Sequence, residues 1–433
     1  MAEGGDLVEA VESRAVEPRR GAIRQPAFRR YLLGMTIDLI GDQAWFIALA
    51  WAAARTTDPG KASLIVAVGT VPRMLLLLPA GVLADRLGAL RVAQGAQALR
   101  IAIMCCALAV ALTRPSNVLL LGAVALVFGV GDALRLPAAG ALPPALLAPR
   151  DLAQGQGLIT TAGRIASVVA GPVAGLALTA AGFTGAVGII VVLFLLAFLA
   201  FGTLRGKVDE RERPASRAES SLLSGLQYIG RQRDVLIVLI VVTALNLALA
   251  GPLNLGVVLR IERSGWGPAA LGLIIGVFGA AAALGALSLT VFEPRRSPVV
   301  VGFAWTAVSA ASIAALGYTP DIVLSVLAVA VAGLALGPAG ALLLGLVQAR
   351  TDPDYRGRVM SLVSFSAFGL TPVALAGFGF LAQAIGLPQA FLASGGAVVL
   401  LALAGMLSPA MRALTLPEPT SEGLPREPDH GRS

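Results

Sequence analysis

Two carboxylates occupy one side of a strongly apolar stretch near the start of the chain. Asp38 and Asp42 are four residues apart in the segment TIDLIGDQAW, so a helix would place both on the same face. A carboxylate within an apolar helix is costly unless it meets a partner or water, and inside membranes such residues often carry protons. The spacing therefore predicts proton chemistry or a buried ion pair on this face.

The first half of the chain carries further charges inside apolar runs, and they are Arg73, Arg100, Asp132, Arg135 and Arg164. Each ion would cost ~2.5–3.5 kcal/mol at the centre of a bilayer, so these side chains must face a partner, a cavity or an inner interface. At about 1.5 Å per residue, Asp42 and most of the arginines fall near mid-membrane. Asp38 and the Asp132–Arg135 pair are expected nearer the cytoplasm.

These residues yield candidates for proton coupling. Asp42 is the leading candidate for the proton carrier, and Asp38 and Asp132 are the alternatives. The expected counter-charges are Arg73, Arg135 and Arg164. An arginine that approaches or leaves a carboxylate changes the affinity of that carboxylate for a proton. The alternative interpretation is a static network of salt bridges that locks the helices together.

Membrane helices must position these side chains. The chain has 433 residues, of which 57% are hydrophobic and 13% charged, and its mean hydropathy of +0.82 is far above that of soluble domains. Backbone groups in lipid must be hydrogen-bonded within the chain, so apolar runs of ~20 residues predict helices. The expected helices are 31–54, 62–84, 91–112, 117–140, 154–180, 184–204, 235–259, 267–291, 298–317, 321–346, 358–384 and 388–410.

The distribution of positive charge predicts the orientation. With a cytoplasmic N-terminus, most Lys and Arg fall in inner segments, and the outer loops hold only Arg55, Lys61, Arg114, Arg260 and Arg263. This asymmetry predicts a multi-pass protein of the cell membrane with both termini cytoplasmic. It also leaves no basic face for nucleic acid, despite the net charge of +8. Residues 1–30 lack the apolar core of a signal peptide, so the first helix is expected to be an uncleaved anchor.

A polar stretch divides six helices from six. The expected parts are an N-terminal tail (1–30), two bundles (31–204 and 235–410), a linker (205–234) and a C-terminal tail (411–433). Within the linker, residues 220–233 resemble an amphipathic helix on the inner surface. The bundles share a proline pattern, because Pro137 and Pro172 are 35 residues apart and Pro338 and Pro372 are 34 apart. Such parallel repeats are known in secondary transporters.

The loop GVLADRLGALR, residues 81–91, resembles the signature loop of the major facilitator superfamily. The residues that carry this resemblance are Gly81, Asp85, Arg86, Gly88 and Arg91. The two glycines are expected to permit close packing and a sharp turn, with Asp85 near the start of the third helix. The resemblance implies an all-α integral membrane fold of twelve transmembrane helices in two six-helix bundles. It also implies that this loop latches the outward-facing state, although Ala89 and Leu90 replace the usual basic residues.

The segment GRIASVVAGPVAGL, residues 163–176, resembles the fifth-helix motif of exporters in this superfamily. The matching residues are Gly163, Gly171, Pro172 and Gly175, whereas Ser167 and Leu176 replace glycines. Small residues at this spacing allow close helix packing, and the eighth helix has a comparable stripe at Gly272, Gly276 and Ala280. The resemblance implies packing between these two helices, and generic small-residue packing is the alternative. The inner loops, 142–158 and 352–362, are similar to those of the bacterial drug- and siderophore-exporter branch.

The family resemblance also implies a central cavity surrounded by helices 1, 4, 7 and 10. Trp45 shares the face of the two carboxylates on helix 1 and is expected to stack on an aromatic or cationic substrate. Asn246 and Asn254 are the cavity candidates of the second half. Arg100 would lie on a peripheral helix and is expected to be structural.

Several chemistries are excluded by what the sequence lacks. The only histidine, His430, lies in the polar tail, and no P-loop motif occurs. Cys105 and Cys106 are expected to be small core residues. We therefore expect no enzymatic activity, no metal and no cofactor. The sequence predicts a monomeric proton antiporter that exports amphipathic drug-like small molecules or natural products. The alternatives are a nutrient facilitator or importer of the same fold and a non-transporting scaffold.

Overall fold

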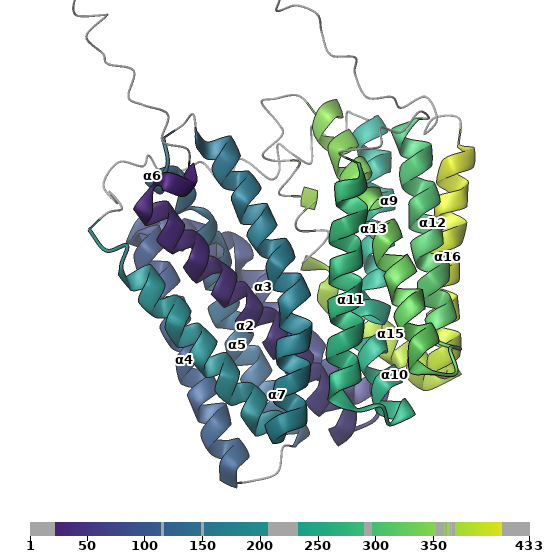
Figure 1. Ribbon diagram of the computed structural model, residues 1–433, viewed down its shortest axis with the longest axis horizontal. Helices are drawn as coiled ribbons and strands as arrows, with labels where there is room; N and C mark the ends of the chain where they lie inside the picture. The colour runs from purple at the N-terminus through teal and green to yellow at the C-terminus, as the bar shows by residue number, and fades with distance from the viewer. Residues whose placement is uncertain are drawn as a thin grey trace, which may run out of the picture. The chain divides into compact units, whose positions relative to one another are not determined.

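The computed structural model describes residues 22–113, 117–148, 151–206, 233–289, 297–351, 359, 362–363, 365 and 369–408. These residues form helices connected by short turns (Figure 1). Residues 220–232 of the expected linker helix, most of the expected N-terminal tail, all of the expected C-terminal tail and much of the start of the eleventh expected helix lie outside the described residues.

The first half runs from a short 3₁₀ turn into long helices. Its elements are η1 (Ala22–Arg24), α2 (Pro26–Thr56), α3 (Pro59–Leu87), α4 (Ala89–Thr113), α5 (Val118–Gly140), α6 (Pro143–Leu146) and α7 (Leu152–Gly202). The backbone departs from helical geometry inside α7 at Ala181 and Gly182, and Gly182 has a φ of +62° that suits a glycine. This break separates the fifth and sixth expected helices, so α7 contains two membrane spans.

The second half has the same helical character. Its elements are α9 (Arg233–Gly251), η3 (Pro252–Gly256), α10 (Val257–Ser264), α11 (Gly267–Ser288), α12 (Pro298–Leu316), α13 (Ile322–Arg350), α15 (Thr371–Ile385) and α16 (Leu387–Leu407). A π-helical turn, η3, joins α9 to α10 and continues the seventh expected helix as far as Ser264. Arg260 and Arg263 therefore lie in a helix, and their expected placement in a loop was wrong.

The prediction of twelve membrane helices is confirmed. Within the described residues, ten helices are long and apolar enough to cross a membrane, and the 51-residue α7 counts as two because of its break. The shorter apolar helix α15 completes the twelve. Several ends follow local rules: Asn117 and Asp321 cap α5 and α13 by accepting a backbone N–H at 2.8 Å, and proline occupies the first turns of α2, α12 and α16.

The chain divides into two compact units. Unit 1 comprises Met1–Thr57, Val68–Ser216 and Trp266–Gly276, and unit 2 comprises Asp58–Ala67, Arg217–Gly265 and Val277–Ser433. In unit 1, α2 packs along α7, and α4 packs on α5 and α7. In unit 2, α12 packs on α13 and α16, and α9 packs on α15. Each unit thus includes the first residues of one helix from the other half of the sequence. Unit 1 includes the start of α11, and unit 2 includes the start of α3.

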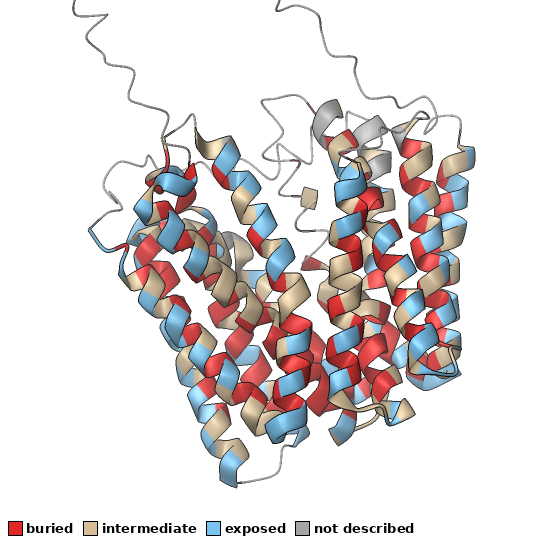
Figure 2. Ribbon diagram, in the orientation of Figure 1, coloured by how far each residue is buried: buried red, intermediate tan, exposed pale blue. Residues whose placement is uncertain are grey.

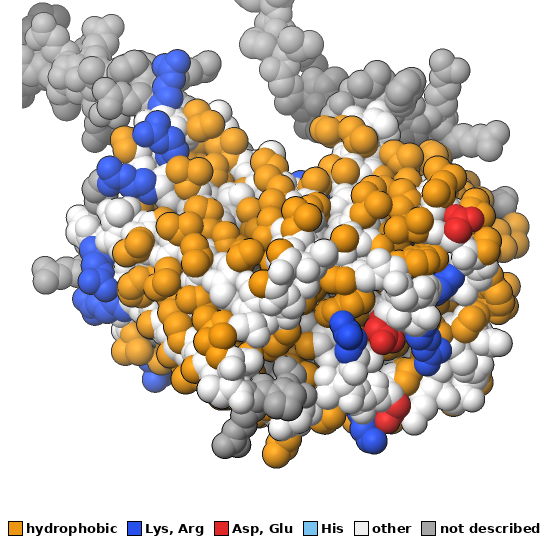
Figure 3. Space-filling view, turned by 60° about the horizontal axis from the view of Figure 1, so that its bottom comes forward, with side chains coloured by type: hydrophobic (Ala, Val, Ile, Leu, Met, Phe, Trp, Pro, Cys, Tyr) orange, Lys and Arg blue, Asp and Glu red, His pale blue; other side chains and the backbone are white. Residues whose placement is uncertain are grey.

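The helices bury one side and expose another that is equally apolar. Buried and exposed positions alternate along the turns of each helix (Figure 2), and apolar side chains are widespread on the surface (Figure 3). Leu119 is 84% exposed and Leu400 is 69% exposed, each within an apolar span. An apolar exterior over ~20-residue helices is what lipid requires.

Candidate functional site

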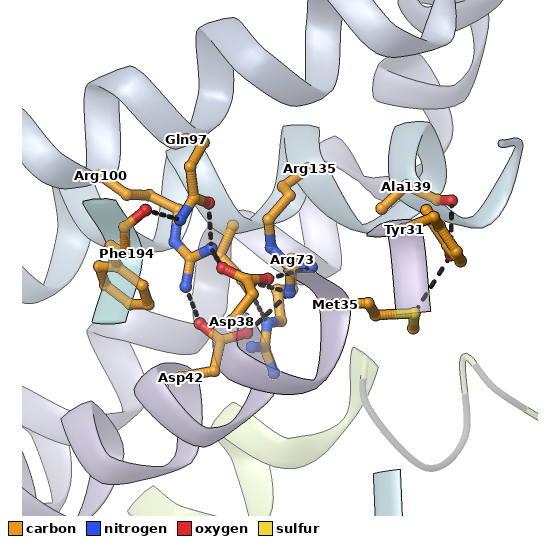
Figure 4. A network of polar contacts seen from close by, with 11 residues as sticks. Tyr31, Met35, Asp38, Asp42, Arg73, Gln97, Arg100, Arg135, Ala139 and Phe194 are labelled. Carbon is orange, nitrogen blue, oxygen red and sulfur yellow. Dashed lines mark hydrogen bonds and ion pairs between the residues drawn. The ribbon is translucent and has the colours of Figure 1, made fainter. Parts of the chain in front are cut away.

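Six charged side chains from four helices of unit 1 meet in its interior. We call them the charge network, and they are Asp38 and Asp42 of α2, Arg73 of α3, Arg100 of α4, and Asp132 and Arg135 of α5 (Figure 4). The four-residue spacing on α2 points both of its carboxylates at α4 and α5, as a shared helix face requires. Three carboxylates meet three guanidinium groups, so the network is formally neutral.

Arg100 holds both carboxylates of α2. Its Nη1 donates to Asp38 Oδ1 at 2.9 Å and to Gln97 Oε1 at 2.9 Å, and its Nη2 donates to Asp42 Oδ1. The Arg100 guanidinium carbon lies 4.7 Å from the ring centroid of Phe128 and 4.1 Å from that of Phe194. Arg100 is completely buried, so two aromatic faces and two carboxylates replace its hydration.

Arg135 links the same carboxylates to α5. Its Nη1 lies 2.7 Å from Asp38 Oδ2, and its Nη2 lies 2.7 Å from Asp42 Oδ2 and 3.1 Å from Asp132 Oδ1. The second oxygen of Asp132 accepts from Arg73 Nε, and the Arg73 guanidinium lies over the Phe46 ring at 5.1 Å. Every carboxylate of the charge network therefore meets at least two arginines.

Two glycines make room for these side chains. A Cβ on Gly131 would lie 2.7 Å from Arg100 Cγ, and a Cβ on Gly41 would lie 2.6 Å from Phe194 Cε1. Gly41 directly precedes Asp42 and Gly131 directly precedes Asp132, so each glycine is adjacent in sequence to a carboxylate while it makes room for a side chain of another helix, Phe194 or Arg100. Sequence reasoning missed both, and a glycine beside a charged residue in an apolar helix was the available signal.

The network differs from the expected arrangement at two points. Asp42 was expected at a different depth from Arg135, but the two side chains are in contact, with Arg135 Nη2 2.7 Å from Asp42 Oδ2 (Figure 4). Arg100 was expected to be structural and was not named among the counter-charges, yet it contacts the two carboxylates of α2. Asp42 keeps a small exposure, with 7% of its side chain accessible, whereas the side chains of Asp38 and Asp132 are fully buried.

The three residues that were expected to contact substrate are Trp45, Asn246 and Asn254, and the structure shows the environment of each. Trp45 is 1% exposed and packs against Phe128 and Phe183 with ring centroids 5.4 and 6.4 Å apart, so it belongs to an aromatic core and is not open to a substrate. The expectation that Trp45 lines a cavity was wrong. Asn246 is half-buried and donates to the Val242 carbonyl within α9, and Asn254 is exposed in η3 and donates to the Ala250 carbonyl.

Arg164 does not join the charge network. It is exposed on α7, and among the residues that the structure describes no carboxylate pairs with it. The acids buried in the described membrane spans of unit 1 are already engaged by the other three arginines. The structure therefore does not support a counter-charge role for Arg164.

The signature loop is a one-residue turn. α3 ends at Leu87 and α4 begins at Ala89, and Gly88 between them has a φ of +93°, which confirms the expected sharp turn. Asp85 is exposed in the last turn of α3, so its expected position at the start of the next helix was wrong. A Cβ on Gly81 would meet nothing within 4 Å, which contradicts the expected close packing there. Arg86 and Arg91 are exposed on either side of the turn.

The fifth-helix motif packs on α11 within unit 1. A Cβ on Gly171 would lie 2.9 Å from the Gly272 carbonyl oxygen and 3.0 Å from the Gly276 nitrogen, and one on Gly175 would lie 2.8 Å from Gly272 Cα. A Cβ on Gly276 would lie 3.1 Å from Cδ of Pro172. The expected packing of the two small-residue stripes is therefore confirmed at these positions, with backbone against backbone. Gly163, at the start of the motif, has open space instead.

A matched pair of substitutions tests this contact. We expect Gly171→Ala to destabilise the protein by about 1–3 kcal/mol, because the added methyl meets backbone atoms that cannot rotate away. Gly163→Ala is the control in the same helix and is expected to be neutral or stabilising by up to about 1 kcal/mol. Denaturant unfolding in mixed micelles measures both, and equal stability of the two variants would contradict the close contact.

The family follows from a comparison with known proteins. The model described as Major Facilitator Superfamily matches residues 31–376 of this chain. The chain belongs to this superfamily. It is a membrane transporter rather than an enzyme, and its charge network lies within the first of the two helical bundles typical of the fold.

Relatives and solved structures agree with this assignment. The protein called "Multidrug efflux pump Tap" from Mycobacterium bovis (strain BCG / Pasteur 1173P2) is 27% identical over 410 residues, which cover 92% of this transporter and 96% of the relative. Tap from Mycobacterium tuberculosis (strain ATCC 25618 / H37Rv) matches to the same extent. A mutant of the nucleoside transporter NupG has a TM-score of 0.73 at 16% identity, covering 88% of this transporter and all of that chain. The peptide transporter POT in complex with sulfate has a TM-score of 0.72 at 15% identity, covering 92% and 98%. These structures support the fold alone.

Proposed function

We propose that this transporter exports amphipathic drug-like small molecules in exchange for protons, with Asp42 as the proton carrier. The observation that carries the proposal is the neutral charge network, which joins four helices through three carboxylates and three arginines. Protonation of one carboxylate leaves a surplus positive charge in a buried site, and buried surplus charge is costly. A proton that enters the network therefore favours a different arrangement of the helices, which is the coupling that an antiporter needs.

Asp42 is favoured over the other two carboxylates by access and by its partners. It alone among them retains exposure, at 7% of its side chain, so a proton reaches it with the least rearrangement. Its two oxygens accept from Arg100 and Arg135, which belong to α4 and α5. Neutralising Asp42 weakens the hold of α2 on both helices at once. A static network of salt bridges would not need the residual exposure of the Asp42 side chain.

Export and a broad, apolar substrate class are supported by two further features. The relatives named as multidrug efflux pumps align over nearly the whole chain, and the fifth-helix motif packs as exporter motifs of this superfamily are expected to pack. In unit 2, α9 and α13, the seventh and tenth helices, carry charged residues only at their ends, namely Arg233 and Asp234 at the start of α9 and Arg350 at the end of α13. A pocket formed by such helices suits a hydrophobic ligand better than a sugar, which needs several hydrogen-bond partners.

Everted membrane vesicles test the exchange. An imposed proton gradient, acidic inside, should drive uptake of a lipophilic fluorescent dye, and a protonophore should abolish it. Vesicles without the protein measure background. Equilibration of the dye across the membrane without accumulation, whatever the gradient, would favour a facilitator. If no compound of a broad amphipathic panel moves under any gradient, the export proposal fails, and a narrow importer or a non-transporting scaffold replaces it.

The proposed orientation places this transporter in the cell membrane as a monomer with both termini cytoplasmic. We expect Thr113→Cys, at the outer end of α4, to react with an impermeant thiol reagent in intact cells. Thr203→Cys, after the end of α7, should react only after lysis. Both sites are exposed. The background must lack Cys105 and Cys106, because these two cysteines are also exposed and their expected core position was wrong. The opposite labelling pattern would reverse the orientation.

A further inference from the structure

Arg164 is a membrane-embedded cation that the charge network does not use. It lies ten residues after Gln154, where the apolar span of α7 begins, and so about 15 Å into that span. It is exposed, and no partner contacts it among the described residues. An unpaired arginine at this depth costs ~2.5–3.5 kcal/mol or more if it faces lipid. Its guanidinium has five N–H donors, which need acceptors.

The face of α7 that carries Arg164 packs against protein farther along the helix. Gly157, Arg164 and Gly171 follow one another at intervals of seven residues, so neighbours in this series lie about 20° apart around the helix and the outer two about 40° apart. At Gly171 this face packs directly on the backbone of α11. Two to four turns earlier the same face is open, because Arg164 is exposed and a Cβ on Gly157 would meet nothing within 4 Å.

Polar groups adjoin Arg164 along this stretch. Ser167, one turn later, accepts from Gln43 Nε2 of α2 at 3.3 Å, and its own hydroxyl donates to the Gly163 carbonyl. Thr160 and Thr161, one turn earlier, are exposed and donate to carbonyls of their own helix. The hydroxyl protons are thus already used within α7. Arg164 is the group on this face with free donors and a full charge, so the ligand that fits it is an anion.

We propose that Arg164 binds the acidic group of transported molecules, so that the substrates include amphipathic acids held by a bidentate guanidinium–carboxylate pair. This proposal rests on the proposed export function. The neutrality of the charge network supports it, because each buried carboxylate of the network is already held by arginines. Arg164 therefore adds one uncompensated positive charge to the described membrane spans of unit 1. A planar carboxylate satisfies two guanidinium donors at once and neutralises that charge.

The test compares an acid with its neutral ester. Binding of 1-pyrenebutanoate and of its methyl ester is measured by fluorescence on the purified protein in uncharged detergent. We expect Arg164→Gln to weaken binding of the acid about tenfold and to leave binding of the ester unchanged. Arg164→Lys should give an intermediate loss, since lysine keeps the charge but loses the planar fork. Arg29→Gln, at an exposed arginine near the start of α2, is the control and should change neither.

The other outcomes overturn the proposal. Equal weakening of acid and ester would indicate a general disturbance of α7, and no change in either would show that Arg164 binds no transported acid. A phospholipid headgroup could supply the same anionic chemistry, so phosphatidylglycerol is titrated as a competitor. If it displaces the acid from the wild type, and proteoliposomes fail to transport the acid, the site belongs to lipid. Because binding in detergent needs no gradient, failure here is distinct from failure of proton-driven export.

Discussion

Asp42→Asn is expected to abolish proton-driven accumulation while leaving substrate exchange intact. The asparagine cannot take up a proton, so the charge network no longer changes its charge during the cycle. Gradient-driven dye uptake in everted vesicles should fall about tenfold or more, in line with ordinary coupling energies of about 1–3 kcal/mol. Exchange of labelled for unlabelled dye at equal concentrations needs no gradient and should continue at a similar rate.

The fold should survive this substitution because the two arginines keep other partners. Arg100 still meets Asp38 and Gln97, and Arg135 still meets Asp38 and Asp132. Asp58→Asn is the matched control, since Asp58 lies outside the membrane spans, where it pairs with Lys61 at 3.1 Å. That variant should accumulate dye normally. Normal accumulation by Asp42→Asn would exclude Asp42 as the carrier and transfer the test to Asp38 and Asp132.

Arg100→Gln is expected to cause the largest loss of stability among single changes in the network. It removes a fully buried cation that neutralises two carboxylates of α2 and fills the space between Phe128 and Phe194. Breaking a buried ion pair from one side typically costs about 3–5 kcal/mol, because a buried charge is left without compensation. Unfolding in mixed micelles should show a loss in this range.

A double variant separates charge imbalance from lost packing. Arg100→Gln combined with Asp42→Asn restores equal numbers of positive and negative groups in the network. We expect it to recover part of the lost stability, which a double-mutant cycle would record as a favourable interaction energy. Arg29→Gln, at an exposed arginine outside the network, should change stability by no more than about 0.5 kcal/mol. Additive losses in the double variant would show that packing around Arg100, rather than charge balance, dominates.

The membrane helices could be predicted from local sequence, because lipid imposes a local requirement. Each span needs ~20 apolar residues regardless of its neighbours, so the apolar runs identify α4, α5 and α16 to within a few residues. The turn at Gly88 and the small-residue stripe of α7 were equally readable, since a glycine's conformational freedom and small size act at its own position. Helix ends were less accurate, as α2 shows by beginning at Pro26 rather than residue 31.

The ion-pair partners of the charged residues could be identified only from the packed helices of the tertiary structure. Sequence spacing placed Asp38 and Asp42 on one face, but nothing local could show that Arg100 and Arg135 would both meet them. Pairing across helices depends on crossing angle and relative depth, which follow from side-chain packing along the whole helix. For the same reason Trp45 turned out to be buried and Arg164 exposed without a partner among the described residues, although both lie in equally apolar runs. Composition determines that a helix enters the membrane, and tertiary packing determines which of its charges are neutralised there by partners on other helices.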